Sequence, residues 1–112
     1  MKMVEAIVRP DRLQPVLEGL AEIGYPGITI TEVKGHGKQK GMTQHWRGNE
    51  YTIQFIPKMK IEVVILDEDL GSTIDIIVRR SRTGKMGDGK IFVMDVDEAV
   101  RVRTGDSGFN AI

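Results

Sequence analysis

Residues 53–82, IQFIPKMKIEVVILDEDLGSTIDIIVRRSR, join a long strand pattern directly to a helix pattern. The run from Val63 to Leu66 is apolar throughout, which predicts a strand buried on both sides. Acidic residues follow at 67–69 and arginines end the stretch, as the dipole of an intervening helix favours. The predicted apolar face of that helix consists of Leu70, Ile74, Ile77 and Val78. The stretch therefore predicts a strand, with Pro57 at a bend or an edge, followed by an amphipathic helix.

The N-terminal segment also predicts a strand and then a helix. Residues 1–9 are apolar enough for a buried strand, and Pro10 with Asp11 signals a helix start. Apolar residues then recur at spacings of three and four, at Leu13, Val16, Leu17, Leu20 and Ile23. Gly24 ends this helix.

Three further strands are predicted from β-branched and apolar patterns, at residues 28–35, 90–96 and 99–104. The order strand, helix, strand, strand, helix, strand predicts an α+β, ferredoxin-like βαββαβ fold with a short additional C-terminal strand. We expect this fold to form one domain over residues 1–112. Two helices cover one face of an antiparallel sheet, and a chain of this length has no third layer, so we expect self-association to cover the other face.

The overall composition narrows the class of protein. Lysine plus arginine and aspartate plus glutamate are both 16, so the net charge is zero, which argues against nucleic-acid binding through bulk charge. There is no cysteine, which excludes a disulfide framework and a thiolate metal site. The N-terminus is too short and too charged for a signal peptide, and no apolar stretch approaches the ~20 residues of a membrane span. We therefore expect a soluble, cytoplasmic protein without direct membrane insertion.

Between Gly35 and Thr52 the periodicity is lost, and the sequence is polar, basic and rich in glycine. Structureless connections longer than ~12–15 residues are usually functional or disordered. Trp46 beside Arg47 favours a flexible arm that contacts partners, because both residue types are enriched at binding hot spots. A solvated insertion is the alternative.

The segment TGKMGDGK, residues 83–90, joins the second helix to the next strand. Glycines allow successive backbone N–H groups to approach an anion, and Lys90 adds a positive charge. The alternative is an ordinary turn in which glycine supplies positive φ, and the segment does not match the P-loop pattern G-x-x-x-x-G-K-[ST]. The pattern by itself leaves both interpretations open.

Arg101 and Arg103 are two residues apart in the predicted last strand, so we expect their side chains on the same side. Two neighbouring guanidinium groups favour a phosphate ligand, whereas pairing with an acidic residue such as Glu62 is the alternative. If the segments of Lys90, Arg101 and Arg103 lie side by side in one sheet, these cations and the glycine segment suit a triphosphate. No Ser-His-Asp set or other catalytic nucleophile is evident in the sequence.

Several longer motifs resemble the PII nitrogen-regulatory proteins. They are TGKMGDGKIFV, EVKGHGKQKG, WRGNEY, IPKMKIE and RVRTG, in the family's order and spacing. The resemblance extends from the opening MKMVEAIVRP to the closing AI. It implies a homotrimer of ferredoxin-like subunits that binds ATP or ADP in the cleft between neighbours. It also implies a signal-transduction protein rather than an enzyme.

By matching position, the resemblance assigns nucleotide contacts to several segments. The implied residues are Thr29, Gly35, Gly37, Lys38, Val64, Gly87, Asp88, Gly89, Lys90, Arg101 and Arg103. Among them, Gly87 to Lys90 would form the loop around the phosphates. That loop would be half of a site whose other half belongs to a neighbouring subunit.

The resemblance implies a second effector, 2-oxoglutarate, which binds together with Mg²⁺ and ATP. Its implied contacts are Gln39, Lys40, Gly41 and Lys58. Gln39 would also be a ligand of Mg²⁺, and Lys58 would pair with a carboxylate of 2-oxoglutarate.

The long segment at about residues 37–55 would be the family's T-loop, which changes conformation with ligand and docks onto targets. The implied targets are ammonium transporters or nitrogen-assimilation enzymes such as glutamine synthetase. Arg47 would be the residue that enters a transporter pore. Tyr51 is the residue that is uridylylated in many members, although Trp46 and Asn49 depart from the usual residues near it.

Two other functions are compatible with a ferredoxin-like fold. A small phosphate-binding enzyme of the acylphosphatase kind would need a water-orienting amide beside the phosphate loop, and none stands out. An RNA-binding module would need aromatic residues on its central strands, where this chain has Phe92 alone, and a positive charge that this chain lacks.

Overall fold

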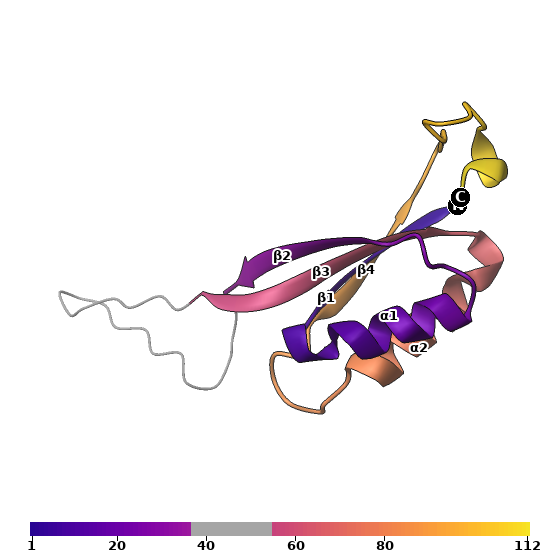
Figure 1. Cartoon of the computed structure of the whole chain (residues 1–112). Helices are drawn as coiled ribbons and strands as arrows, with labels where there is room; N and C mark the ends of the chain where they lie inside the picture. The colour runs from indigo at the N-terminus through magenta and orange to yellow at the C-terminus, as the bar shows by residue number, and fades with distance from the viewer. Residues whose placement is uncertain (37–54) are drawn as a thin grey trace.

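The computed structural model describes residues 1–36 and 55–112. Its elements, in chain order, are β1 (Lys2–Val8), η1 (Pro10–Arg12), α1 (Leu13–Glu22), β2 (Thr29–Gly35), β3 (Ile56–Ile65), η2 (Asp67–Asp69), α2 (Leu70–Ser81), β4 (Lys90–Asp95) and η3 (Gly108–Ala111), where η marks a short 3₁₀ helix (Figure 1). The two helices and four strands follow the predicted order, so the ferredoxin-like α+β fold is confirmed.

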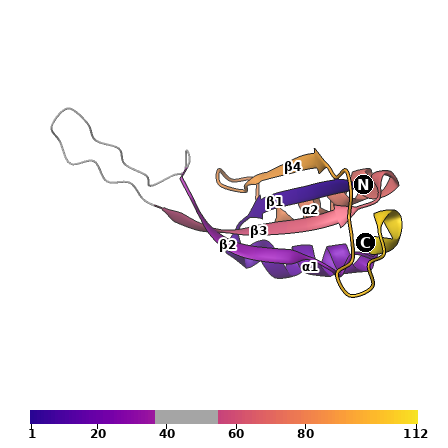
Figure 2. The same cartoon turned by 90° about the horizontal axis from the view of Figure 1, so that it is seen from above.

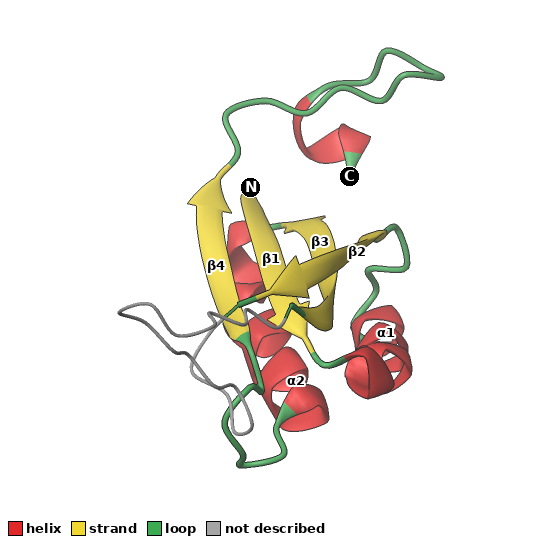
Figure 3. Cartoon of the chain, turned by 90° about the vertical axis from the view of Figure 1, so that its left-hand side faces the viewer, coloured by secondary structure: helices red, strands yellow, loops and turns green. Residues whose placement is uncertain are grey.

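The four strands form one antiparallel sheet in the order β2-β3-β1-β4. In the central strand β1, Val4 pairs with Val63 of β3 on one side and with Val93 of β4 on the other. Both helices pack on the same face of this sheet (Figure 3). The two chain termini lie at the same end of the sheet (Figure 2). Pro57 lies beyond Met59, the last β3 residue that pairs with β1, which agrees with its predicted edge position.

The core lies between the sheet and the two helices. The strands alternate as expected for a sheet with one covered face, and every second residue of β1 from Val4 to Val8 is buried. The buried apolar residues are Val4, Ala6, Val8, Val16, Leu20, Ile61, Val63, Ile65, Ile76 and Ile77. This arrangement explains the apolar spacings in the two helices and the run at the end of β3.

The buried face of α2 differs by part of a turn from the prediction. Thr73, Ile76, Ile77 and Ser81 are buried, whereas Ile74 and Val78 are only half-buried. The two buried hydroxyl groups form hydrogen bonds with nearby backbone carbonyl groups. Thr73 Oγ1 donates to the Asp69 carbonyl at 2.7 Å, and Ser81 Oγ donates to the Ile77 carbonyl at 2.6 Å. Polar residues can therefore occupy the core side of this helix.

The opposite face of the sheet is not covered by the described part of this chain. Val64 and Ile7 are half-buried there, and Phe92 of β4 is 48% exposed. The prediction that the Val63–Leu66 run is buried on both sides therefore holds, within this chain, only for the face that the helices cover. Three charged side chains form a cluster on the open face, where Lys60 Nζ lies 3.6 Å from Glu5 and 3.7 Å from Glu62.

The predicted short strand at residues 99–104 is wrong. Val100 makes one isolated bridge to Ser107, and the chain between them forms a tight turn. The Arg101 N–H donates to the Asp106 carbonyl, and the Gly105 N–H donates to the Arg101 carbonyl, both at 2.8 Å. Gly105 has φ +75°, which turns the chain back on itself. In the two described ranges, no helix has the length and apolar character that a membrane crossing requires.

Candidate functional site

The segment between α2 and β4 is a compact loop, which we call the glycine loop (residues 83–89). Its glycines at 84, 87 and 89 all have positive φ, at 84°, 99° and 102°. Gly89 has a second constraint, because a Cβ there would lie 1.7 Å from the Ile7 carbonyl oxygen. Glycine is therefore required at position 89 both by its backbone angle and by the contact with β1. The predicted turn with positive φ is confirmed, although this does not by itself exclude an anion.

The carboxylate of Asp88 organises the glycine loop from within. It accepts hydrogen bonds from the backbone N–H groups of Thr83 at 2.9 Å and Gly84 at 2.8 Å, and from the Thr83 hydroxyl. The Arg9 Nε–H also donates to it, at 3.0 Å. The Thr83 hydroxyl and these other donors hold the pKa of Asp88 well below its usual range. These bonds occupy the Asp88 carboxylate within the loop. Asp88 would therefore contribute to an anion site through its backbone and not through its side chain.

Two cationic side chains hold successive carbonyl groups of the same loop. Arg9 Nη2 donates to the Met86 carbonyl at 2.8 Å, and Lys58 Nζ donates to the Gly87 carbonyl. Lys58 is only 8% exposed. Burial lowers its pKa, and the nearby Arg9 lowers it further. An anion close to this ammonium group would be favoured, since it would compensate a poorly solvated charge.

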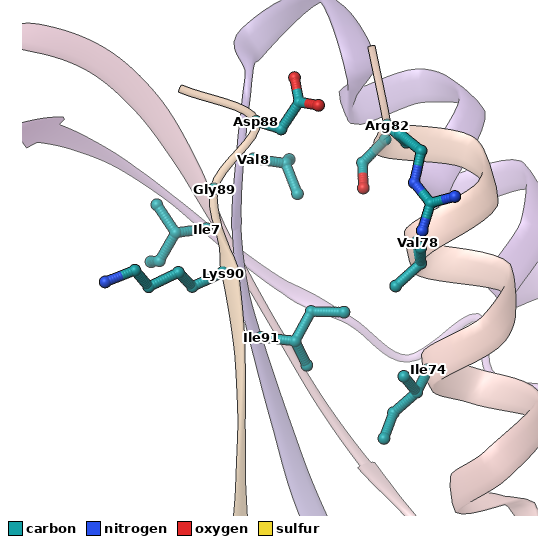
Figure 4. Close-up of a pocket in the computed structure, with 10 residues that line it drawn as sticks. Ile7, Val8, Ile74, Val78, Arg82, Asp88, Gly89, Lys90 and Ile91 are labelled. Atoms are coloured by element: carbon teal, nitrogen blue, oxygen red, sulfur yellow. The ribbon is translucent and has the colours of Figure 1, made fainter. Parts of the chain in front are cut away.

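Lys90 and Asp88 stand at the entrance of an apolar slot between α2 and the β1–β4 edge. Figure 4 shows Lys90 extending away from α2, whereas Ile91 and Ile74 point toward one another across the slot. The slot has a volume of about 370 Å³. Half of its lining residues are aliphatic, and its charged lining residues are Arg82, Asp88 and Lys90.

A larger pocket of about 510 Å³ lies at the opposite end of the sheet, and we call it the Tyr25 pocket. It is lined by Met3, Gly24, Tyr25, Pro26, Gly27, Thr29, Glu62, Val64, Arg101, Ala111 and Ile112. Its volume is in the range of small-molecule sites. The lining combines apolar groups with the hydroxyl-bearing Tyr25 and Thr29, the carboxylate-bearing Glu62 and the guanidinium-bearing Arg101.

The wall of the Tyr25 pocket is fixed by hydrogen bonds. The Tyr25 hydroxyl donates to the Asp69 carboxylate and accepts the Leu66 N–H at 3.2 Å. The Tyr25 backbone N–H donates to the Leu20 carbonyl at 2.9 Å. These contacts tie the 24–27 turn to the start of α2, so the pocket wall is held in place without a ligand.

The predicted site residues fall into two separate groups. Gly35 lies beside Lys58, near the glycine loop, because a Cβ at position 35 would lie 3.4 Å from Lys58 Cγ. Thr29, Val64 and Arg101 line the Tyr25 pocket instead.

The expectation that Lys90 and Arg101 lie side by side in one sheet is wrong for a single chain. Lys90 pairs with Ile7, whereas Met3 lines the Tyr25 pocket four residues further along β1, or ~13 Å at the usual rise of a strand. Arg103 is exposed in the C-terminal turn. The alternative that Arg101 pairs with Glu62 is not met either, since within the described residues Glu62 forms its ion pair with Lys60.

Several predicted residues lie outside the described ranges. They are Gly37, Lys38, Gln39, Lys40, Gly41, Arg47 and Tyr51, together with most of the predicted T-loop at 37–55. Their roles stay predictions. Among the residues that are described, no group of three or more histidine, cysteine, aspartate or glutamate side chains could hold a metal ion.

No sequence pattern predicted a role for Arg9 or Tyr25. Arg9 follows a strand and precedes a proline, and its partners at positions 86 and 88 are almost 80 residues away in the chain. The one available signal was Asp88 itself, an acidic residue between two glycines, a pattern that is also typical of ordinary turns. Tyr25 follows a helix-ending glycine, and only the fold brings it to Asp69.

Comparison with known proteins relates the whole chain to one family. The profile of the family described as "Nitrogen regulatory protein P-II" matches residues 1–106. A nitrogen regulatory protein P-II from Bradyrhizobium diazoefficiens is 53% identical over 112 residues, which is all of both chains. The corresponding protein from Rhizobium meliloti and nitrogen regulatory protein P-II 1 from Escherichia coli are each 51% identical, again over the full length of both chains.

Proposed function

Because this chain belongs to the P-II family of nitrogen regulatory proteins, we propose that it senses ATP or ADP, and 2-oxoglutarate in the presence of Mg²⁺-ATP. The family is named for regulation, and its members are regulatory proteins rather than enzymes. The chain would therefore report ligand occupancy to partner proteins through a change in conformation.

The observation that carries this proposal is the construction of the glycine loop. Three glycines with positive φ and a fully engaged Asp88 carboxylate form a fixed backbone shape, and Lys90 follows it directly at the start of β4. Backbone N–H groups in such a loop suit phosphate oxygens, to which Lys90 adds charge. The Tyr25 pocket, with Thr29, Val64 and Arg101, suits the nucleoside and a second phosphate contact.

The distance between these two regions supports a site that is shared by two copies of the chain. One subunit would contribute the glycine loop and the next would contribute the Tyr25 pocket. The uncovered face of the sheet, with Phe92 48% exposed, supports assembly into the proposed homotrimer.

Lys58 supports the proposed binding of 2-oxoglutarate. Lys58 is almost fully buried as a residue, and its ammonium group contacts the glycine loop, so a carboxylate bound there would lie next to the nucleotide phosphates. We propose that Gln39, Lys40 and Gly41 complete this site. Since the described residues offer no carboxylate cluster, Mg²⁺ would take its ligands from phosphate oxygens, 2-oxoglutarate and Gln39.

Residues 37–55 would transmit the signal. We propose that this segment docks onto an ammonium transporter or a nitrogen-assimilation enzyme such as glutamine synthetase, with Arg47 at the contact. Tyr51 would be the position of modification, and the protein would act in the cytoplasm. Control of a partner needs ligands that favour different states of the segment. ADP would favour one state, and ATP together with 2-oxoglutarate would favour another.

Calorimetry of the purified protein with ATP, ADP and 2-oxoglutarate, with and without Mg²⁺, tests this function. We expect ATP and ADP to bind directly, and 2-oxoglutarate to bind only when both ATP and Mg²⁺ are present. The absolute mass in solution should equal three chains. An absence of nucleotide binding, or steady release of phosphate from ATP at a rate typical of enzymes, would overturn the proposal.

A further inference from the structure

We infer that Arg9 is a positioning residue for the glycine loop, and that it directs the N–H groups of that loop toward the phosphates. The inference rests on the proposed function, because it assigns a role at the proposed phosphate site. The Arg9 guanidinium bridges two parts of the loop. Its Nε–H donates to Asp88 Oδ1 at 3.0 Å and its Nη2 donates to the Met86 carbonyl at 2.8 Å.

The bond to Met86 fixes the orientation of a peptide group. All peptide bonds in the described residues are trans, so the N–H of each peptide points opposite to its C=O. Because the Met86 carbonyl points toward Arg9, the N–H of Gly87 points away from Arg9. The Gly87 carbonyl points toward Lys58 in the same way, so the Asp88 N–H points away from Lys58.

These two N–H groups are available to a ligand. Within residues 1–36 and 55–112, no hydrogen bond uses the N–H of Gly87 or of Asp88. Two successive N–H groups that have no partner in the protein can bind one anion between them. Arg9 thus acts through the backbone of the loop, and its own charge is already engaged by Asp88 and a carbonyl.

The shape of the guanidinium explains why arginine stands at position 9. A planar fork can donate to a carboxylate and a carbonyl at the same time, whereas an ammonium group is a single point of charge. The Arg9 and Asp88 side chains are only 22% and 23% exposed, so water competes weakly for these bonds. A lysine at position 9 keeps the positive charge and loses the bridge.

Arg9→Lys therefore distinguishes two effects on phosphate binding, because it removes the positioning of the glycine loop and keeps the attraction by positive charge. We expect the affinity for ATP and ADP, measured by calorimetry, to fall about tenfold, which corresponds to the loss of one charge-assisted hydrogen bond. The affinity for adenosine, measured by ligand-observed NMR, should stay unchanged, since adenosine has no phosphate. A general loss of structure would weaken all three ligands together.

The matched control is Arg79→Lys. Arg79 Nε lies 3.0 Å from Asp75 Oδ2, the same distance as in the Arg9–Asp88 pair, but the Arg79 and Asp75 side chains are 64% and 63% exposed on α2. Among the described residues, no hydrogen bond or ion pair of these two side chains reaches the glycine loop. We expect Arg79→Lys to bind ATP, ADP and adenosine as the unchanged protein does. Thermal unfolding and the mass in solution should be alike for both variants and the unchanged protein.

Hydrogen exchange of the protein without ligand provides a second measurement. We expect Arg9→Lys, and not Arg79→Lys, to speed amide exchange in the peptides that cover residues 84–90. Equal ATP affinity and equal exchange in Arg9→Lys and the unchanged protein would overturn the positioning role. If the unchanged protein binds no nucleotide, the proposed function falls instead, and the exchange result still decides whether Arg9 orders the loop.

Discussion

Gly19 of α1 lies directly against Ile76 of α2, so closely that a Cβ at position 19 would be 2.6 Å from Ile76 Cγ1. The two helices meet at this point, and both residues are buried. Glycine is an unfavourable residue in a helix interior, and its presence is explained here by the lack of room for any side chain. The contact thus sets the distance between the helices that cover the sheet.

Gly19→Ala should destabilise the protein by about 1 kcal/mol, because the strain of overpacking exceeds the gain in helix propensity. Gly71→Ala is the matched control, since Gly71 also lies in a helix but has open space where a Cβ would be. We expect Gly71→Ala to stabilise the protein by about 0.5–1 kcal/mol. Urea unfolding measures both. Stabilisation by both substitutions would contradict the close packing at position 19.

Gly89→Ala should disturb the start of β4 and the glycine loop together. The substitution combines φ +102° with a clash against the Ile7 carbonyl, and backbone atoms cannot yield as a side chain can. We expect a loss of at least about 2 kcal/mol in the free energy of unfolding. Gly84→Ala tests backbone strain alone, because position 84 has positive φ and open space, and it should cost about 1 kcal/mol. Similar losses in the two variants would refute the Ile7 contact.

The Asp88 carboxylate should make stability depend on acid pH. Its pKa in the folded protein is lowered by the Thr83 hydroxyl and the other donors, below the ~3.9 of an unfolded aspartate. Its contribution is therefore complete above about pH 4 and is lost as the pH falls through the lowered folded value.

Asp88→Asn should thus lower the unfolding temperature at pH 7, and the difference from the unchanged protein should shrink as the pH falls below about 4. Asp75→Asn, which alters an exposed helix pair, should show only a small difference at pH 7. Calorimetric scans between pH 7 and 3 provide the comparison. A difference for Asp88→Asn that is constant with pH would argue against an ionised, hydrogen-bonded Asp88.

The sequence predicted those parts of the fold that local pattern determines. The four strands and two helices follow from alternation and from helical spacing, and the glycine loop follows from its glycines. The buried face of α2 was partly missed because Thr73 and Ser81 are polar residues, whereas each hydroxyl donates to a backbone carbonyl four residues earlier in the chain.

The remaining errors concern long-range structure. Alternating Arg and Val at 100–103 is typical of a strand, yet the Arg101 and Gly105 hydrogen bonds close a turn there. The contacts of Arg9 join residues that are almost 80 positions apart, and no local pattern encodes such a pair. The family resemblance supplied the site residues and implied a site divided between neighbouring subunits, but it did not say which of these residues lie together in one chain. The structure groups Thr29, Val64 and Arg101 in the Tyr25 pocket, away from Lys90.

The separation of the site residues within one chain leads to a test in which two variants, each impaired in ATP binding, restore ATP binding when they assemble together. Lys90 lies at the glycine-loop end of the sheet, and Arg101 lies at the Tyr25 pocket. Lys90→Ala and Arg101→Ala should each bind ATP much more weakly, while their mass in solution stays unchanged. If the site is shared by neighbouring subunits, each variant still carries one intact half.

Equal amounts of Lys90→Ala and Arg101→Ala, unfolded together and refolded, should therefore regain ATP binding at roughly one site in four, since an interface is intact only when the correct half comes from each variant. Calorimetric stoichiometry of the mixture measures this fraction. The two variants mixed after folding, without exchange of subunits, serve as the control and should regain nothing. Recovery in neither sample, with correct assembly, would show that Lys90 and Arg101 of the same chain act on the same ligand.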